Sequence, residues 1–459
     1  MIIRDAIDAL KSWYSREHRK PLLIRGARQV GKTTLVRMFS EIEHIQLIEI
    51  NCEKPWGFLS LIEKLDPEMV IQAIEFEFNI TINPANSLIF FDEVQNTPSV
   101  LKLLRYFYEE FSEYKVITTG SLLEFVLDEP QFSIPVGRLE IMYLGPFSFE
   151  EFLRAAGEQP ALDVLQTFQF GDNIEQHIHV KLTQLLRRYV AIGGMPEVIQ
   201  AYVQNLSMVE LERIKNSIID TFKLDFHKYK KNTHPALLSI IFDSLPTQIG
   251  GKLKYSNIDK SYKSNAIGKS LHQLCLAKIV SKAFNTGCNG VPLGAEKKHR
   301  FFKCFMLDIG LIHTQLKLNP FEVSEADELN YINKGALAEQ LIAQQLMVQH
   351  QYFMEPELYY WAREKKAASA EVDFVIINNE RQIIPVEVKA GSTGSLRSLQ
   401  IMVIEKSLHH AVRFNSMPPS IFHEKRNTVK GESRFTLYSL PHYLSGQLLR
   451  IVNKINKNQ

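Results

Sequence analysis

One short segment, GARQVGKTT from Gly26 to Thr34, limits what this chain can fold into more than any other. It follows the apolar run PLLIR and precedes TLVRMF, whose apolar spacing predicts a helix. The pattern GxxxxGK[ST] between a strand and a helix is typical of a loop whose backbone N–H groups surround phosphate oxygens. An ordinary glycine-containing turn is the alternative, and the flanking strand and helix disfavour it. We therefore expect a phosphate site in an α/β domain.

The residue types in this loop suggest a division of roles. Gly26 and Gly31 allow the backbone to curl around the phosphates, and Lys32 would reach the β and γ phosphates of ATP as a catalytic cation. The Thr33 hydroxyl would complete the shell of a Mg²⁺ ion that keeps several waters. The expected nucleotide-binding residues of the loop are Gly26, Ala27, Arg28, Gln29, Val30, Gly31, Lys32, Thr33 and Thr34.

Two carboxylates follow the apolar residues of LIFFDEVQ. Asp92 and Glu93 stand at the carboxyl end of a buried strand, where open α/β sheets bind ligands. Asp92 would hold Mg²⁺ through water, and Glu93 would polarise the attacking water as the general base. An Asp-Glu pair after an apolar run is more often an ordinary strand end, so the upstream loop carries this assignment. Thr119, at the end of the strand YKVITTGS, would sense the γ phosphate or orient the water, unless its role is structural.

Arg138, in IPVGRLEIMYLGPFSF, is the candidate for a cation that stabilises the charge developing in the transition state. The same subunit or a neighbouring one would supply it, and the second case predicts a homo-oligomer. A surface arginine bonded to a carboxylate is an equally weighted alternative.

Length and periodicity divide the chain into four segments. With 459 residues, 45% of them hydrophobic, the chain can bury more than one core. Residues 1–148 alternate buried strands with helices, which predicts a parallel sheet covered by helices, and residues 149–232 have the spacing of a helical lid. Residues 233–322 contain short helices and then two strand-like runs around a glycine-rich loop, the pattern of a winged helix. A polar, acidic stretch leads into a last α/β domain at 323–459.

The segment AEVDFVIINNERQIIPVEVKAG, residues 370–391, predicts a hairpin that brings two acids together. If the polar NNER stretch turns the chain at residue 380, Asp373 faces Glu387, and Glu371 faces Lys389. The first of these is a like-charge pair, destabilising by about a few tenths of a kcal/mol. We expect a divalent cation to offset the repulsion, with Lys389 beside it to stabilise charge developing on a phosphate. The solvated face of an amphipathic hairpin is the alternative, at near even odds from spacing alone.

These segments resemble, one after another, the signatures of a prokaryotic AAA-type ATPase family whose members carry a C-terminal domain of unknown function. The likeness covers nearly the whole chain. It is carried by LLIRGARQVGKTTLV, LIFFDEVQ, ITTGS, VGRLEIMYLGPFSFEEFL, YVAIGGMPEVI, FMLDIGL, GALAEQLI, YYWARE, AEVDFVI and IPVEVKAG. The resemblance implies an ATPase core with a helical lid, a winged helix and a C-terminal domain similar to restriction endonucleases. It places Lys32, Thr33, Asp92 and Glu93 in the ATP site, and it assigns no role to Arg138.

The hairpin also resembles the PD-(D/E)XK nuclease signature, which implies roles for Asp373, Glu387 and Lys389. Glu339, in KGALAEQLIAQQL, stands where such nucleases often add a third acid. The resemblance thus implies a second Mg²⁺ or Mn²⁺ held by Glu339, Asp373 and Glu387, with Lys389 as a catalytic residue. A nuclease fold does not by itself establish nuclease chemistry.

Charge and cysteine content constrain the surroundings of the protein. With 53 Lys and Arg against 51 Asp and Glu, the net charge is +2, so a DNA partner would be held by a local basic patch. Four scattered cysteines, and no apolar run near the roughly 18 residues of a membrane span, predict a cytoplasmic protein without a membrane anchor. We expect an ATP-hydrolysing protein that couples its nucleotide state to a nuclease-like domain acting on nucleic acid. A signalling or scaffold ATPase whose C-terminal domain binds protein or DNA without cleavage is the alternative.

Overall fold

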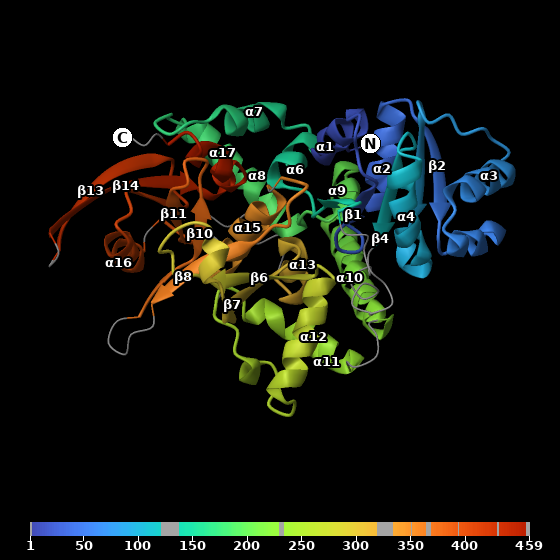
Figure 1. The fold of residues 1–459 in the computed structure, drawn as a ribbon. Helices are drawn as coiled ribbons and strands as arrows, with labels where there is room; N and C mark the ends of the chain where they lie inside the picture. Colours follow the sequence, from blue (N-terminus) through green and yellow to red (C-terminus); the bar gives the residue numbers. More distant parts are fainter. Residues whose placement is uncertain are drawn as a thin grey trace.

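The computed structural model describes residues 2–120, 137–228, 234–318, 334–349, 351–363, 369–392, 394–428 and 431–455 (Figure 1). The expected boundaries at 232/233 and 322/323 lie outside these residues. Among the described residues, no helix is both long enough and apolar enough to cross a membrane.

The N-terminal segment is built on a five-stranded sheet, and the predicted parallel arrangement is confirmed. Its strands are β1 (Leu22–Arg25), β2 (Gln46–Asn51), β3 (Ser87–Asp92), β4 (Val116–Gly120) and β5 (Glu140–Tyr143), in the order β2-β3-β4-β1-β5. Because β4 alone separates β1 from β3, the carboxyl ends of these three strands meet at one edge. The loop after β1, the acids after β3 and the threonine near the end of β4 are thereby brought together.

Helices cover both faces of this sheet, as the alternation of strand side chains requires. On one face Leu22, Ile24 and Phe90 pack against α1 (Ala6–Ser15) and α2 (Lys32–Ile42). On the other, Leu23 and Phe91 pack against η1 (Gly57–Lys64), α3 (Pro67–Phe78) and α4 (Ser99–Glu110). A short turn, η2 (Val94–Asn96), follows β3.

The next segment is helical in its described part. It contains α6 (Phe149–Ala155), α7 (Gln159–Thr167), α8 (Gln176–Ile192), α9 (Pro196–Val203), α10 (Met208–Asp225) and η3 (Phe226–Lys228). After it come α11 (Pro235–Ser244), η4 (Leu245–Thr247), η5 (Tyr255–Asn257), α12 (Ser264–Leu276), β6 (Val280–Asn285), η6 (Leu293–Glu296), β7 (Lys298–Met306) and α13 (Ile309–Gln315). The strands β6 and β7 pair antiparallel and correspond to the two strand-like runs of the sequence.

The C-terminal segment contributes to two sheets. Its elements are α15 (Lys334–Val348), β8 (Leu358–Arg363), β9 (Ala370–Val372), β10 (Phe374–Ile377), β11 (Ile383–Val388), α16 (Arg397–Lys406), β12 (His410–Asn415), β13 (Ser420–Thr428), β14 (Gly431–Pro441), η7 (His442–Gln447) and α17 (Leu448–Val452). One sheet has the order β10-β11-β12-β14-β13. The other has the order β7-β6-β8-β9, so the β6–β7 hairpin shares a sheet with the C-terminal segment.

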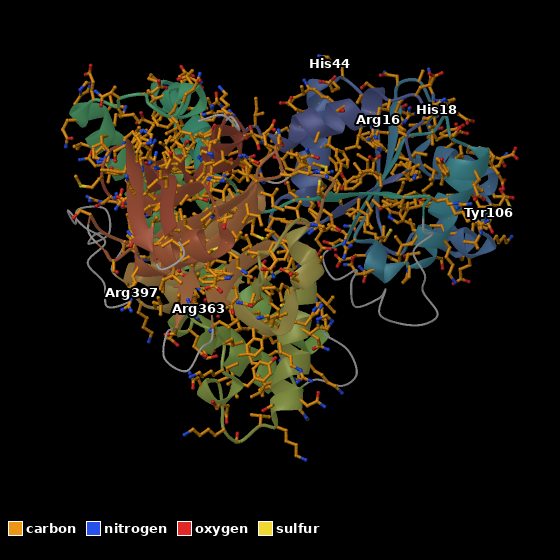
Figure 2. All side chains as sticks on the ribbon, turned by 60° about the vertical axis from the view of Figure 1, so that its left-hand side comes forward. Arg16, His18, His44, Tyr106, Arg363 and Arg397 are labelled. Atoms are coloured by element: carbon orange, nitrogen blue, oxygen red, sulfur yellow. The ribbon has the colours of Figure 1, made fainter. Side chains whose placement is uncertain are left out.

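A single hydrophobic core extends through these last three parts of the chain. It includes side chains from α8, α12, β7, α15, β11 and η7, for example Tyr189, Leu271, Phe305, Leu341 and Val386. The N-terminal sheet lies to one side of this body, opposite β13 and β14 (Figure 1). Figure 2 shows the same separation through exposed side chains, with Arg16, His18 and His44 on the N-terminal part and Arg397 on the C-terminal part.

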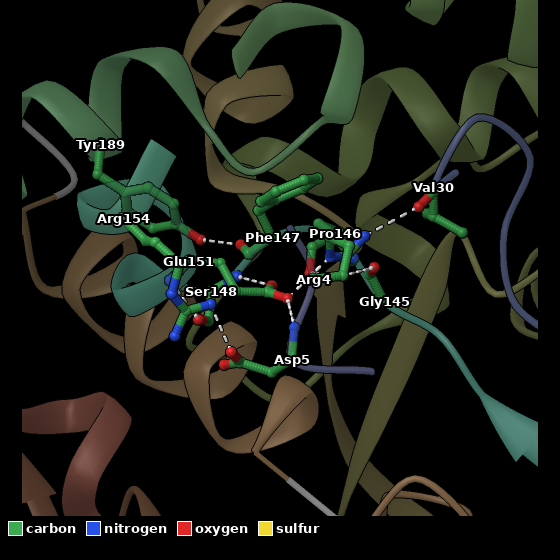
Figure 3. A network of polar contacts seen from close by, with 10 residues as sticks. All are labelled: Arg4, Asp5, Val30, Gly145, Pro146, Phe147, Ser148, Glu151, Arg154 and Tyr189. Atoms are coloured by element: carbon green, nitrogen blue, oxygen red, sulfur yellow. Dashed lines mark hydrogen bonds and ion pairs between the residues drawn. The ribbon is translucent and has the colours of Figure 1, made fainter. Parts of the chain in front are cut away.

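Arg4 joins the N-terminal part to the first helix of the helical segment (Figure 3). Its Nε donates to Glu151 Oε1 at 2.8 Å, and its other nitrogens donate to the carbonyl oxygens of Val30, Gly145 and Pro146 at 3.0–3.3 Å. Glu151 also forms a capping box with Ser148 at the start of α6. The side chains of Arg4 and Glu151 are only 6% and 3% exposed, so neither charge has water as an alternative partner.

We expect Arg4→Met to lower the free energy of unfolding by about 3 kcal/mol, because it leaves the Glu151 carboxylate buried without its partner. Urea denaturation followed by the fluorescence of Trp13, which is buried in α1, measures this loss. Arg154→Met is the matched control, since its pair with Asp5 is 29% and 45% exposed and should contribute less than about 1 kcal/mol. Equal losses in the two variants would contradict the assignment.

Candidate nucleotide site and C-terminal acidic cluster

The phosphate loop lies between β1 and α2 and requires glycine at two positions. Gly31 has φ 89°, in the left-handed region, immediately before the first residue of α2. A Cβ on Gly26 would lie 2.3 Å from the carbonyl oxygen of Leu144, so a side chain would push the loop away from the end of β5. Ala27 and Val30 are buried in the core beneath the loop, whereas Thr34 is exposed on α2.

Lys32 is held under the loop by backbone oxygens. Its Nζ donates to the carbonyl oxygens of Gly26 at 3.0 Å and Ala27 at 2.8 Å. Burial lowers the pKa of Lys32 to about 8, and the nearby charges of Glu93 and Asp92 oppose that shift. The ammonium therefore lies where the loop closes, in the electrostatic field of both acids.

Two other predicted residues, Thr33 and Thr119, meet at Asp92. Thr33 Oγ1 donates to Asp92 Oδ2 at 2.9 Å, and the Thr119 hydroxyl donates to the other carboxylate oxygen. Burial raises the pKa of Asp92, and the two threonine hydrogen bonds oppose the rise. In this structure Thr119 positions Asp92, and a role in sensing phosphate stays a prediction.

Glu93 lies just beyond the strand and has a left-handed backbone with φ 53°. The Gln95 amide donates to Glu93 Oε2 at 2.5 Å, a contact that the sequence did not suggest. Because left-handed φ is costly for a residue other than glycine, this turn between β3 and η2 is a specific feature of the site.

Arg138 lies away from this site within one subunit. It precedes β5, which runs parallel to β1, so it lies at the edge of the sheet opposite the phosphate loop. Its Nε is 3.0 Å from Glu109 Oε1 at the end of α4, and 45% of its side chain is exposed. This is the contact described by the surface-arginine alternative, and any contact with the phosphates would have to come from another copy of the chain.

The helical segment contacts the loop through residues that sequence reasoning missed. Both Asp225 carboxylate oxygens accept hydrogen bonds from Arg28 Nη1 at 2.7 Å, and Lys228 lies 3.0 Å from the same carboxylate. A Cβ on Gly31 would lie 3.5 Å from Pro196 Cγ, at the start of α9. The signal for the first contact was a lone acid in the otherwise basic KLDFHKYKK.

The C-terminal hairpin has the predicted register. Phe374 faces Val386 and Ile377 faces Ile383. Continued by one residue, this register places Asp373 opposite Glu387. Asp373 lies in the bend between β9 and β10, where its Oδ2 accepts the backbone N–H of Val388 at 2.8 Å.

The predicted pair of Glu371 with Lys389 is wrong. The chain bends at Asp373 and leaves the hairpin, so that Glu371 pairs with Ala362 of β8 in the other sheet. Lys389 Nζ lies 2.5 Å from Glu387 Oε1 instead. The regular alternation of residues 370–377 concealed this change of sheet.

Lys303 of β7 is the unforeseen member of the acidic cluster, defined here as Glu339, Glu371, Asp373 and Glu387. Its Nζ lies 3.0 Å from Glu339, 2.8 Å from Glu371 and 3.4 Å from Asp373. Burial lowers the pKa of Lys303, but the three carboxylates outweigh that effect and raise it. Burial, together with the neighbouring Asp373, raises the pKa of Glu339 and of Glu387.

These residues do not fit the expected divalent ion as they stand. Among the described residues, no three His, Cys, Asp or Glu side chains are arranged to hold a metal ion. Of the expected ligands, Glu339 and Asp373 instead share the Lys303 ammonium, and Glu387 pairs with Lys389. The sequence signal for Lys303 was a charge within the apolar strand HRFFKCFMLD.

Comparison with known families distinguishes the parts of the chain. Residues 18–153 match a family described as AAA domain, whereas residues 183–322 and 334–443 match two domains of unknown function, DUF8612 and DUF4143. No match was found among curated proteins. A solved Walker-type ATPase of Pyrococcus abyssi is 15% identical, with a TM-score of 0.43, over 69% of this chain and 96% of that one. The N-terminal part is thus similar to AAA domains, in agreement with its parallel sheet and its phosphate-loop pattern.

We expect Thr119→Val to reduce the rate of ATP hydrolysis by about tenfold to a hundredfold, because a hydrogen bond to a buried carboxylate contributes about 1.5–3 kcal/mol. Steady-state ATPase measurements test this. Thr118→Val is the control, since Thr118 is equally buried in β4 but its hydroxyl bonds to the Leu22 carbonyl at 3.4 Å. An unchanged ATPase rate in Thr119→Val would show that Asp92 does not need the Thr119 hydrogen bond.

Proposed function

We propose that this protein binds and hydrolyses ATP at the site formed by the phosphate loop, Asp92 and Glu93. The observation that carries the proposal is the convergence on one buried carboxylate: Thr33 and Thr119 both bond Asp92, beside the Lys32 ammonium. The residues present fit Mg²⁺, since an oxygen-rich pair at the start of a helix is what this ion takes in phosphate sites. Bound Mg²⁺, held by Thr33 and through water by Asp92, would neutralise charge between the β and γ phosphates.

The side chains divide the work of hydrolysis. The N–H groups of the loop and the start of α2 bind the phosphate oxygens, and Lys32 supplies positive charge to the β and γ phosphates. Glu93 accepts a proton from a water molecule. The oxygen of that water attacks the γ phosphorus, and the bond from this phosphorus to the ADP oxygen breaks. Thr119 keeps Asp92 in place during the reaction.

The nucleotide state would be transmitted through contacts that touch the loop directly. Arg28 links the loop to α10 through Asp225, and Pro196 places α9 against Gly31. A cavity of about 390 Å³ lies where Gly26 and Ala27 meet β6 and α15. We propose that residues 149–232 act as a lid over the P-loop core of residues 1–148. Residues 233–322 would form a winged helix, and residues 323–459 a domain similar to restriction endonucleases.

The C-terminal domain would be the effector of this switch and would bind DNA or a protein partner in the cytoplasm without cutting it. The Lys303 ammonium within the acidic cluster favours binding over cleavage. A homo-oligomer would allow Arg138 of one copy to reach the nucleotide of the next.

We expect Lys32→Ala to lower the ATPase rate by a factor of about a hundred or more, because the cation at the phosphates contributes about 3 kcal/mol or more to transition-state stabilisation. The control is Lys115→Ala. Lys115 is also buried with its Nζ on two backbone carbonyls, at 2.7 Å and 3.0 Å, but it lies outside the loop. ATP hydrolysis by Lys32→Ala at the rate of the natural chain would refute the proposal that this loop forms the ATPase site.

The same assay with and without double-stranded DNA identifies the partner. Stimulation of the natural chain by DNA, absent in Lys32→Ala, supports action on nucleic acid. Indifference to every nucleic acid tested supports a protein partner and a signalling or scaffold role.

Nuclease activity is the second candidate function, favoured by the predicted register that places Asp373 opposite Glu387 with Lys389 nearby. Plasmid and structured DNA incubated with Mg²⁺ or Mn²⁺ test it, with Asp373→Ala as the control. We expect no cleavage by either protein. Cleavage by the natural chain that Asp373→Ala loses would establish the nuclease and reject the binding role.

A further inference from the structure

We infer that Lys303 is the built-in counter-ion of the acidic cluster, and that it occupies the position a divalent cation would need. The acidic cluster includes none of the residues of the nucleotide site, so this role of Lys303 does not depend on ATP hydrolysis. It assigns to a lysine of β7 the neutralising role that the hairpin pattern suggested for a metal.

A metal ion that bridges Glu339 and Asp373 would compete with the Lys303 ammonium for the same space. A Mg²⁺ ion bound by carboxylate oxygens would lie roughly 2.0–2.1 Å from each of them. Lys303 Nζ is already 3.0 Å from Glu339 Oε2 and 3.4 Å from Asp373 Oδ1, in the space between these two acids. An ion bridging them would lie within a few ångströms of the ammonium, in a site with little water to screen the repulsion.

The surroundings hold Lys303 in place. Its side chain is 1% exposed, and Tyr360 places its ring centroid 5.5 Å from Nζ. A Cβ on Gly250 would lie 3.1 Å from Glu339 Oε1, so the backbone that follows η4 packs against this carboxylate. β7 pairs with β6 along its length and also bridges Lys252. The Lys303 ammonium is therefore enclosed by protein and kept from water.

The charge count agrees with a resident ammonium. Four carboxylates face three ammonium groups, because Lys389 pairs with Glu387 and Lys252 lies 3.7 Å from Glu371. Among the described residues, Glu387 Oε2 is buried and has no hydrogen-bond partner. A single proton on one acid completes neutrality, whereas a divalent ion beside Lys303 would leave an excess of positive charge.

The contact also joins two parts of the chain. Lys303 comes from the residues 183–322 matched by one family, and its three partners come from the residues 334–443 matched by another. The ion pairs of Lys303 therefore connect these two parts of the chain, and a metal ion in the cluster would have to replace them.

Calorimetric titration of the full chain with MnCl₂ tests the inference. Lys303→Met removes the charge and keeps most of the side-chain stem. We expect this variant to bind one additional Mn²⁺ per chain, at least tenfold more tightly than the natural chain binds Mn²⁺ at the acidic cluster. Lys303→Met/Asp373→Asn should lose that binding. Lys298→Met, an exposed lysine on the same strand, should bind Mn²⁺ as the natural chain does.

Thermal unfolding gives a second readout. Without metal, Lys303→Met should melt several degrees below the natural chain, and Mn²⁺ should restore part of that loss only in the variant. A folded Lys303→Met that takes up no Mn²⁺ would overturn the inference. If Lys303→Met does not fold, the natural chain and Asp373→Asn are compared by the same titration. Mn²⁺ binding by the natural chain that Asp373→Asn abolishes would overturn the role of Lys303, and identical isotherms for the two proteins would support it.

Discussion

Buried and half-buried positive charges link the parts of this protein, because a cation removed from water must find a carboxylate or carbonyl partner. Arg4 ties the N-terminal helix and the phosphate loop to α6 through Glu151. Arg28 ties the same loop to α10 through Asp225, and Lys303 ties β7 to the C-terminal acids. Each pair joins residues far apart in the sequence, so the geometry of each junction depends on a specific polar contact as well as on apolar packing.

The nucleotide site follows from this arrangement and from the strand order. Since β4 lies between β1 and β3, the phosphate loop, Thr119 and Asp92 follow the carboxyl ends of neighbouring strands and meet there. Three residues from outside the loop contact it: Arg4 donates to the Val30 carbonyl, Asp225 accepts from Arg28, and Pro196 lies near Gly31. A site held from several segments is suited to report its occupancy to all of them, and this is the physical argument behind the proposed switch.

The C-terminal domain shows how one pattern can support two chemistries. Acids placed side by side on a hairpin require a cation, and both a metal ion and a lysine meet that requirement. The hairpin determines only that the negative charge is there. The second sheet, in the order β7-β6-β8-β9, places Lys303 of β7 within ion-pair distance of Glu371 of β9, and so determines that a lysine supplies the positive charge.

The sequence by itself determined the features that local periodicity encodes. The strand, loop and helix around Gly26–Thr34, the parallel sheet and the register of the 374–388 hairpin all follow from alternation and turn residues within short windows. Only the tertiary structure decided which distant charges meet. Asp225 lies 197 positions from Arg28, and Asp373 lies 70 positions from Lys303. Pairing at such separations leaves no periodic trace in the sequence, because it depends on how whole sheets and helices pack.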